Sequence, residues 1–295
     1  MRIMLGSNGW RRTAAIVVLG LSFVVDPALG SGKRSIPWGA MYVPIAEAVD
    51  HAMTGTVAAY RGRSGAERLL VDLPAARASG IRLIVTLGAV APAEYMTGDG
   101  HIDPDSVDRE LEPFFAIAGE IRPYIEDGTV WGVRFLDEPH DPAGCPRGFE
   151  VDPVELGTVY ASIHRHLGDV PIGSTAPPAY MRRVPGAGIA FGQVVHARLP
   201  AGFDDPTQFH TAQSRLAHDH GLLYVASVNA NTNPIDNATF FRTYREMCAI
   251  ETVDFATAWQ WPQGHHPEAS FEARFLDPDP AVQAEIARIP EACAR

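Results

Sequence analysis

Short apolar runs alternate with helical segments along most of the chain. Eight runs have the apolar character of strands, at residues 36–43, 54–60, 81–87, 130–136, 170–174, 189–197, 222–228 and 255–261. Alternating strands and helices are typical of parallel βαβ units. Eight such units close into a barrel, whereas an open doubly wound sheet usually stops at five or six strands. The pattern therefore predicts an α/β fold, a single (β/α)8 TIM barrel that spans residues 31–295.

Three of the expected helices begin at an Asp-Pro step. The steps Asp103-Pro104, Asp152-Pro153 and Asp205-Pro206 each combine an aspartate cap with a proline in the first turn. They predict helices over 103–126, 152–167 and 205–221, and helical patterns continue at 67–79, 237–251 and 280–289. Pro74 predicts a kink or a late start in the helix over 67–79. No glycine-rich phosphate loop follows any of the strands, which argues against a nucleotide-binding fold.

The first 30 residues have the pattern of a signal peptide. Arg2, Arg11 and Arg12 precede an apolar stretch over residues 13–25, and Ala28-Leu29-Gly30 offers a cleavage site. This stretch is short for a membrane span, which needs about 20 residues. We therefore expect a secreted or periplasmic protein with no membrane attachment after cleavage. An uncleaved N-terminal anchor is the alternative.

The charge of the chain limits its partners. The net charge is −11, and loss of the leader removes three arginines and one aspartate, which makes it more negative still. No run of lysine and arginine follows the leader, so we expect neither nucleic acid nor anionic lipid as a partner. We expect a monomer that binds a carbohydrate or another small polar ligand.

The chain contains three cysteines, Cys145, Cys248 and Cys293. Export permits disulfides, and an odd count leaves at least one thiol unpaired. In a (β/α)8 barrel each helix returns from the mouth to the opposite rim, so Cys248 and Cys293 are expected there, at the ends of neighbouring helices. Cys145 follows the fourth strand, at the mouth. We predict a Cys248–Cys293 disulfide and a free Cys145, with three unpaired thiols as the alternative.

Polar and aromatic side chains follow several of the strands, where active sites of barrels are built. They are Tyr42 after the first strand, Asp137 and Glu138 after the fourth, His196 after the sixth, Asn229 after the seventh, and Trp259 and Trp261 in the eighth. A carboxyl group among apolar walls loses hydration, so the pKa of Glu138 is expected to rise toward that of a proton donor. Alternatively, Glu138 caps its loop or pairs with Arg134 or Arg198. Histidine and cysteine spacings suggest no metal site, and no cofactor is expected.

The step Leu136-Asp137-Glu138-Pro139 resembles a motif of the clan A glycoside hydrolases. These retaining (β/α)8 barrels carry Asn-Glu-Pro at the end of strand 4, where the glutamate is the acid/base. Trp259 and Trp261 also resemble the tryptophan that stacks on sugar at the end of strand 8 in these enzymes, although packing in the core is the alternative. The resemblance implies that Glu138 is the general acid/base, that Asp137 assists it, and that the sugar site is lined by Tyr42, His196, Asn229, Trp259 and Trp261.

The sequence departs from this family in two places. Asp137 replaces an asparagine, and the seventh strand lacks the glutamate that serves as nucleophile, because no acidic residue follows it before Asp236. Glycoside hydrolysis generally uses two carboxyl groups, ~5–5.5 Å apart in retaining and ~6.5–9.5 Å apart in inverting enzymes. Glu47, Asp141 and Asp204 are further candidates for the second group. Two hypotheses follow, a secreted glycoside hydrolase-like enzyme and a non-catalytic barrel that binds a glycan or other small ligand.

Overall fold

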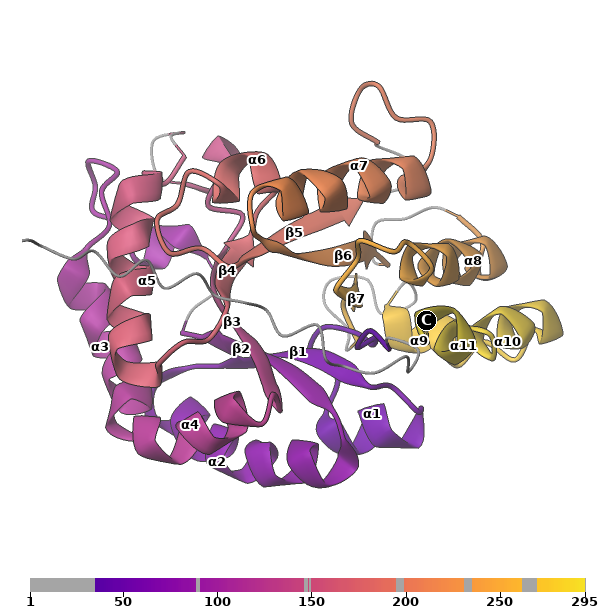
Figure 1. The fold of residues 1–295 in the computed structure, drawn as a ribbon, viewed down its shortest axis with the longest axis horizontal. Helices are drawn as coiled ribbons and strands as arrows, with labels where there is room; N and C mark the ends of the chain where they lie inside the picture. The colour runs from indigo at the N-terminus through magenta and orange to yellow at the C-terminus, as the bar shows by residue number, and fades with distance from the viewer. Residues whose placement is uncertain are drawn as a thin grey trace, which may run out of the picture. The chain divides into compact units, whose positions relative to one another are not determined.

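Seven parallel strands form one sheet, in the order of the chain. The computed structural model describes residues 35–88, 91–145, 148, 150–194, 199–230, 235–261 and 270–294. Within them the strands are β1 Gly55–Tyr60, β2 Arg82–Leu87, β3 Val130–Asp137, β4 Ile172–Thr175, β5 Ile189–Val194, β6 Leu223–Asn229 and β7 Phe255–Trp259. The helices surround the strands (Figure 1). The predicted α/β TIM-barrel fold is confirmed, whereas the predicted leader at residues 1–30 lies outside the described residues.

The first predicted strand is an extended segment that closes the barrel rather than a continuous strand. It lies between the two edges of the sheet, where Trp38 pairs with Ala256 of β7 and Met41 pairs with Val57 of β1, both in parallel. Pro37 has no N–H group to donate, which interrupts a regular ladder. When this segment is counted first, β3 is the fourth member of the barrel and β6 the seventh, as the sequence predicts.

The described helices are α1 Ile45–Asp50, α2 Gly62–Ser79, α3 Pro104–Ala116, α4 Ala118–Glu126, α5 Pro153–Leu167, α6 Pro178–Met181, α7 Pro206–Asp219, α8 Asn237–Cys248, α9 Phe271–Phe275, α10 Pro280–Ile286 and α11 Ile289–Cys293, with short 3-10 turns η1 Pro92–Glu94 and η2 Pro142–Gly144.

The caps predicted at Asp103, Asp152 and Asp205 are all formed by their carboxylates. Two predicted helices are each divided in two. The break before α11 has a clear cause, because Pro290 lacks an N–H group and starts a new helix instead.

Two apolar layers hold these elements together. The interior of the barrel is filled by Met41, Val57, Ile84, Ile189, Phe191, Val225 and Phe255. A larger layer lies between strands and helices and includes Trp38, which is 2% exposed. The barrel is therefore a packed core rather than a pore, and in barrels of this kind ligands bind above the core, at the carboxyl ends of the strands.

A disulfide joins α8 to α11 at the rim opposite the mouth. Cys248 and Cys293 are bonded with their Cα atoms 4.8 Å apart, and Cys145 is a free, buried thiol. This confirms the predicted pairing. None of the helices in the described ranges is long and apolar enough to cross a membrane.

Candidate functional site

Glu138 lies at the mouth of the barrel, directly after β3. Its backbone N–H donates to the carbonyl of Thr175, 3.1 Å away, which ties the end of β3 to β4. Leu136 and Glu138 have φ angles of 66° and 45°, a left-handed region that residues with a Cβ rarely adopt. Strained backbone of this kind is concentrated at functional sites, where the surrounding structure enforces it.

The surroundings of Glu138 favour its protonated form. The side chain is exposed at the mouth, yet the protein around it removes part of its hydration, and Asp137 and Asp141 repel its negative charge. Together these effects raise the pKa of Glu138, partial burial being the larger cause. The direction agrees with the expectation from sequence.

Arg134 is the cation beneath this mouth, and it is fully buried. Its guanidinium group donates to the hydroxyl oxygens of Thr86, Thr175 and Tyr42, each 2.8 Å away. Its ion pair is with Asp137, at 3.7 Å between Nη1 and Oδ1. The charge of Arg134 is thus directed toward Asp137, and no ion pair joins Glu138 to a cation among the described residues.

Tyr42, Asn229 and Trp259 lie on one side of the mouth. The rings of Tyr42 and Trp259 meet edge to face with centroids 5.5 Å apart. Asn229 ends β6 and is in register with Trp259 at the end of β7. The peptide bond between Trp259 and Gln260 is cis. These three residues come from three different parts of the sequence, and the barrel brings them together.

Trp261 lies in the core rather than at the mouth. It is 2% exposed, and its indole N–H donates to Glu47, 2.6 Å away. The predicted eighth strand continues to residue 261, but β7 ends at Trp259, so the strand pattern does not apply to Trp261. Glu47, one of the candidate second carboxylates, is engaged by this indole. His196 and Arg198 lie outside the described residues.

A cavity of about 360 Å³ opens beside Glu138, above β3, β4 and β5. Its walls combine apolar rings with amides and a hydroxyl group, a mixture typical of sites for small polar ligands. The lining residues include Glu138, His140, Thr175, Pro177, Phe191, Gln193, Phe203, Phe209 and Gln213. Sequence reasoning missed Gln193, Phe203 and Gln213. The position of Gln193 near the end of a predicted strand was the one available signal.

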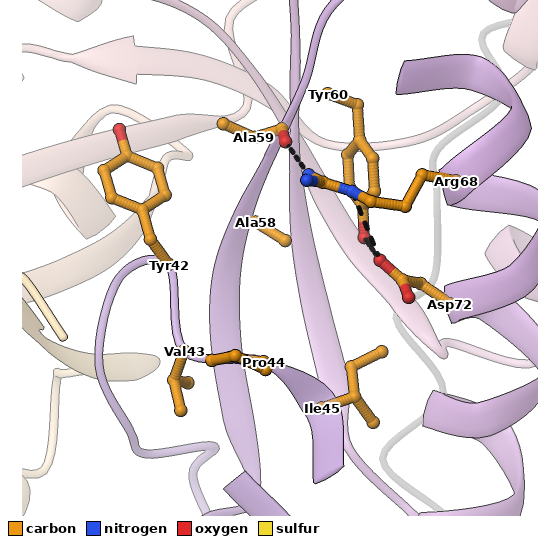
Figure 2. A pocket seen from close by; sticks show the side chains of 9 residues that line it. All are labelled: Tyr42, Val43, Pro44, Ile45, Ala58, Ala59, Tyr60, Arg68 and Asp72. Atoms are coloured by element: carbon orange, nitrogen blue, oxygen red, sulfur yellow. Dashed lines mark hydrogen bonds and ion pairs between the residues drawn. The ribbon is translucent and has the colours of Figure 1, made fainter. Parts of the chain in front are cut away.

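A second hollow, of about 390 Å³, lies at the same rim between α1, β1 and α2 (Figure 2). Tyr42 lines one side of it and Arg68 and Asp72 the other. The carboxylate of Asp72 accepts a hydrogen bond from Tyr60, 2.9 Å away, and lies 3.7 Å from Arg68. Within the described residues, no group of three or more His, Cys, Asp or Glu side chains is arranged to hold a metal ion.

Solved structures with a similar barrel include glycoside hydrolases, although no protein-family model and no curated protein sequence matches this chain. An endo-1,4-beta-mannanase from Rhizomucor miehei matches with a TM-score of 0.60 at 10% identity, over 89% of this chain and 96% of that chain. A cellulase–inhibitor complex matches with a TM-score of 0.56 at 9% identity, over 86% and 92% of the two chains. An endoglucanase matches with a TM-score of 0.55 at 11% identity, over 85% and 96%. At these identities the likeness establishes the fold, a barrel of the kind that clan A glycoside hydrolases have.

Proposed function

We propose that this protein is a secreted or periplasmic enzyme that acts on glycosidic bonds, with Glu138 as its general acid/base. The observation that carries the proposal is the position of Glu138. Its carboxyl group follows the fourth member of the barrel, has a raised pKa and lines a cavity of about 360 Å³ with apolar and amide walls. A raised pKa increases the share of the protonated carboxylic acid, which is the form that can protonate the leaving oxygen of a glycoside.

The neighbours of Glu138 have separate roles in this proposal. Asp137, held by Arg134, assists by raising the pKa of Glu138 through its charge. Trp259 and Tyr42 offer aromatic surface to a sugar ring, and Asn229 offers an amide that can bind its hydroxyl groups. The ligand is a carbohydrate, and the protein acts as a monomer.

The absence of an acidic residue at the end of β6 favours a second candidate, a non-catalytic barrel that binds a glycan. The strand reads Leu-Tyr-Val-Ala-Ser-Val-Asn and ends at Asn229. The site therefore lacks the carboxylate that a retaining glycosidase places there. In such a protein Glu138 accepts hydrogen bonds from the sugar and does no chemistry.

Hydrolysis assays distinguish the two candidates. The purified protein without its leader is tested on chromogenic glycosides and polysaccharides, beside Glu138→Gln and the control Glu112→Gln, whose side chain is exposed on α3. Loss of general acid catalysis is expected to lower kcat/KM by about 10²–10⁴-fold in Glu138→Gln and not in the control. Glycan binding with no hydrolysis by the wild-type protein supports the non-catalytic barrel instead.

A further inference from the structure

His140 is the second titratable side chain in the cavity beside Glu138. The two residues are separated only by Pro139, and the N–H of Asp141 donates to the carbonyl of Glu138, 2.9 Å away, which closes the turn. Among the described residues that line the cavity, Glu138 and His140 are the two that titrate. The histidine therefore adjoins the group to which we assign the chemistry.

One ring nitrogen of His140 is buried and has no hydrogen-bond partner among the described residues. Its Nδ1 atom has no hydrogen bond to any described residue. The ring packs near Tyr180, with centroids 6.1 Å apart, but the hydroxyl group of Tyr180 donates to the carbonyl of Val151. By contrast, Nδ1 of His164 and of His166 each lies within hydrogen-bond distance of a backbone carbonyl. His140 thus differs from His164 and His166, because its buried Nδ1 atom has no such carbonyl beside it among the described residues.

The burial of Nδ1 bears on which of the two ring nitrogens of His140 carries the proton. A buried N–H without an acceptor is costly, so a proton on Nδ1 is disfavoured in both the neutral and the charged ring. The remaining arrangement is a neutral imidazole with its proton on Nε2. Nε2 is not among the buried unpartnered nitrogens, and His140 is one of the residues that line the cavity.

The charges around His140 are compatible with a neutral ring. Asp137 and Asp141 on its own segment and Glu150 from the following loop favour the charged form, but burial outweighs them and lowers the pKa of His140. Glu150 is also partly neutralised by Arg183, which follows α6 and lies 2.7 Å away. The pKa of Glu138, which adjoins the ring, is raised by burial and by the charges of Asp137 and Asp141.

We propose that His140 presents an Nε2–H group to the cavity as a hydrogen-bond donor to an oxygen of the bound sugar, beside the bond that Glu138 protonates. The ligand class is a neutral sugar with an acceptor oxygen at this position, either a hydroxyl or the ring oxygen. His140 is a binding and positioning residue in this scheme and transfers no proton. The identity of the ligand as a sugar rests on the proposed function. The position of the proton on Nε2 does not depend on that function.

Nitrogen NMR of protein labelled with ¹⁵N-histidine tests the position of the proton without any substrate. The resonances of His140 are assigned by their loss in His140→Gln. A neutral ring protonated on Nε2 between pH 6 and 8 supports the inference. A charged ring at pH 7, or a proton on Nδ1, overturns it.

Two substitutions test the contact with the sugar. In His140→Gln the amide nitrogen lies near the former position of Nε2 and keeps a donor, whereas His140→Leu removes the donor. We expect KM, or Kd for a bound glycan, to rise about 3- to 10-fold in the leucine variant, to recover partly in the glutamine variant, and to leave kcat less affected. Thermal unfolding shows whether each variant is folded.

Equal losses in both variants, or no loss in either, overturn the inference. The control is His220→Gln, because His220 is exposed and lies at the C-terminal end of α7, away from the mouth of the barrel. Absence of hydrolysis by the wild-type protein overturns the proposed enzyme, but the NMR result and glycan affinities still decide the role of His140. The two failures are therefore distinguishable.

Discussion

The two rims of the barrel differ in their backbone strain and in the contacts that stabilise them. At the mouth, Leu136 and Glu138 have left-handed backbone and His140 has a buried nitrogen without a partner among the described residues. At the other rim, Asp254 accepts hydrogen bonds from His218 and from the N–H of Tyr224, at 2.7 and 2.8 Å. The same rim carries the Cys248–Cys293 disulfide. Most of the non-glycine residues with left-handed backbone in the described ranges thus lie where a ligand can bind, with Ala52 as the exception, whereas the disulfide lies at the rim where no ligand is expected.

Removal of the disulfide is expected to have the largest effect on stability. Cys293→Ser opens a link between residues 45 apart in sequence, which lowers the free energy of unfolding by about 4 kcal/mol in the chain-entropy model. Urea denaturation under non-reducing conditions measures the change, with Cys145→Ser as the control. Because the bond lies far from the mouth, kcat/KM of the folded variant is expected to stay within about twofold of wild type. A large loss of activity in the folded variant contradicts the division between the rims.

Tyr42→Phe is expected to lower the stability of the protein at the mouth of the barrel, by less than the loss of the disulfide does. It removes the acceptor of one N–H group of the buried Arg134 and leaves that donor unpaired, which costs about 1–3 kcal/mol. Tyr60→Phe is the control, because Tyr60 binds Asp72, a partly exposed carboxylate that water can solvate in its place. The denaturant midpoints of both variants show whether Tyr42→Phe loses more stability than Tyr60→Phe. An equal or larger loss in Tyr60→Phe contradicts the importance of the Arg134 contacts.

The smallest expected effect is a gain of stability in Glu138→Gln that depends on pH. Because the folded protein raises the pKa of Glu138, ionisation of this group opposes folding at every pH above that raised value. The glutamine variant is therefore expected to be more stable than wild type at pH 7. The difference should vanish below about pH 4, where the carboxyl group is protonated in both folded and unfolded chains. Unfolding curves at the two pH values measure it, and a variant less stable at pH 7 contradicts the prediction.

The fold was predictable because its signals are local. Apolar runs and Asp-Pro caps, such as Asp152-Pro153, depend only on neighbouring residues, and all three predicted caps are formed. The disulfide followed from the path of the helices in a barrel. The buried position of Trp261 was not predictable, because it depends on where β7 ends.

The candidate site was predictable only in part. The position of Glu138 after the fourth barrel member follows from the strand pattern. The burial of one nitrogen of His140 depends on side chains that distant segments bring together, and the sequence carries no periodic signal for it. The contacts of Arg134 with Tyr42, Thr86 and Thr175 likewise join three separate strand ends.

The segment that closes the barrel also brings distant parts of the chain together. Ser35 forms an antiparallel bridge with Ala294, and the N–H of Ile36 donates to the carbonyl of Cys293, 2.9 Å away. A short peptide could therefore join residue 294 to residue 35, with new ends opened in an exposed turn such as Asp99–Gly100. In a circularly permuted chain of this kind, the closing segment would be synthesised between its two neighbours in the barrel, so that its pairing with each would become a local event in folding.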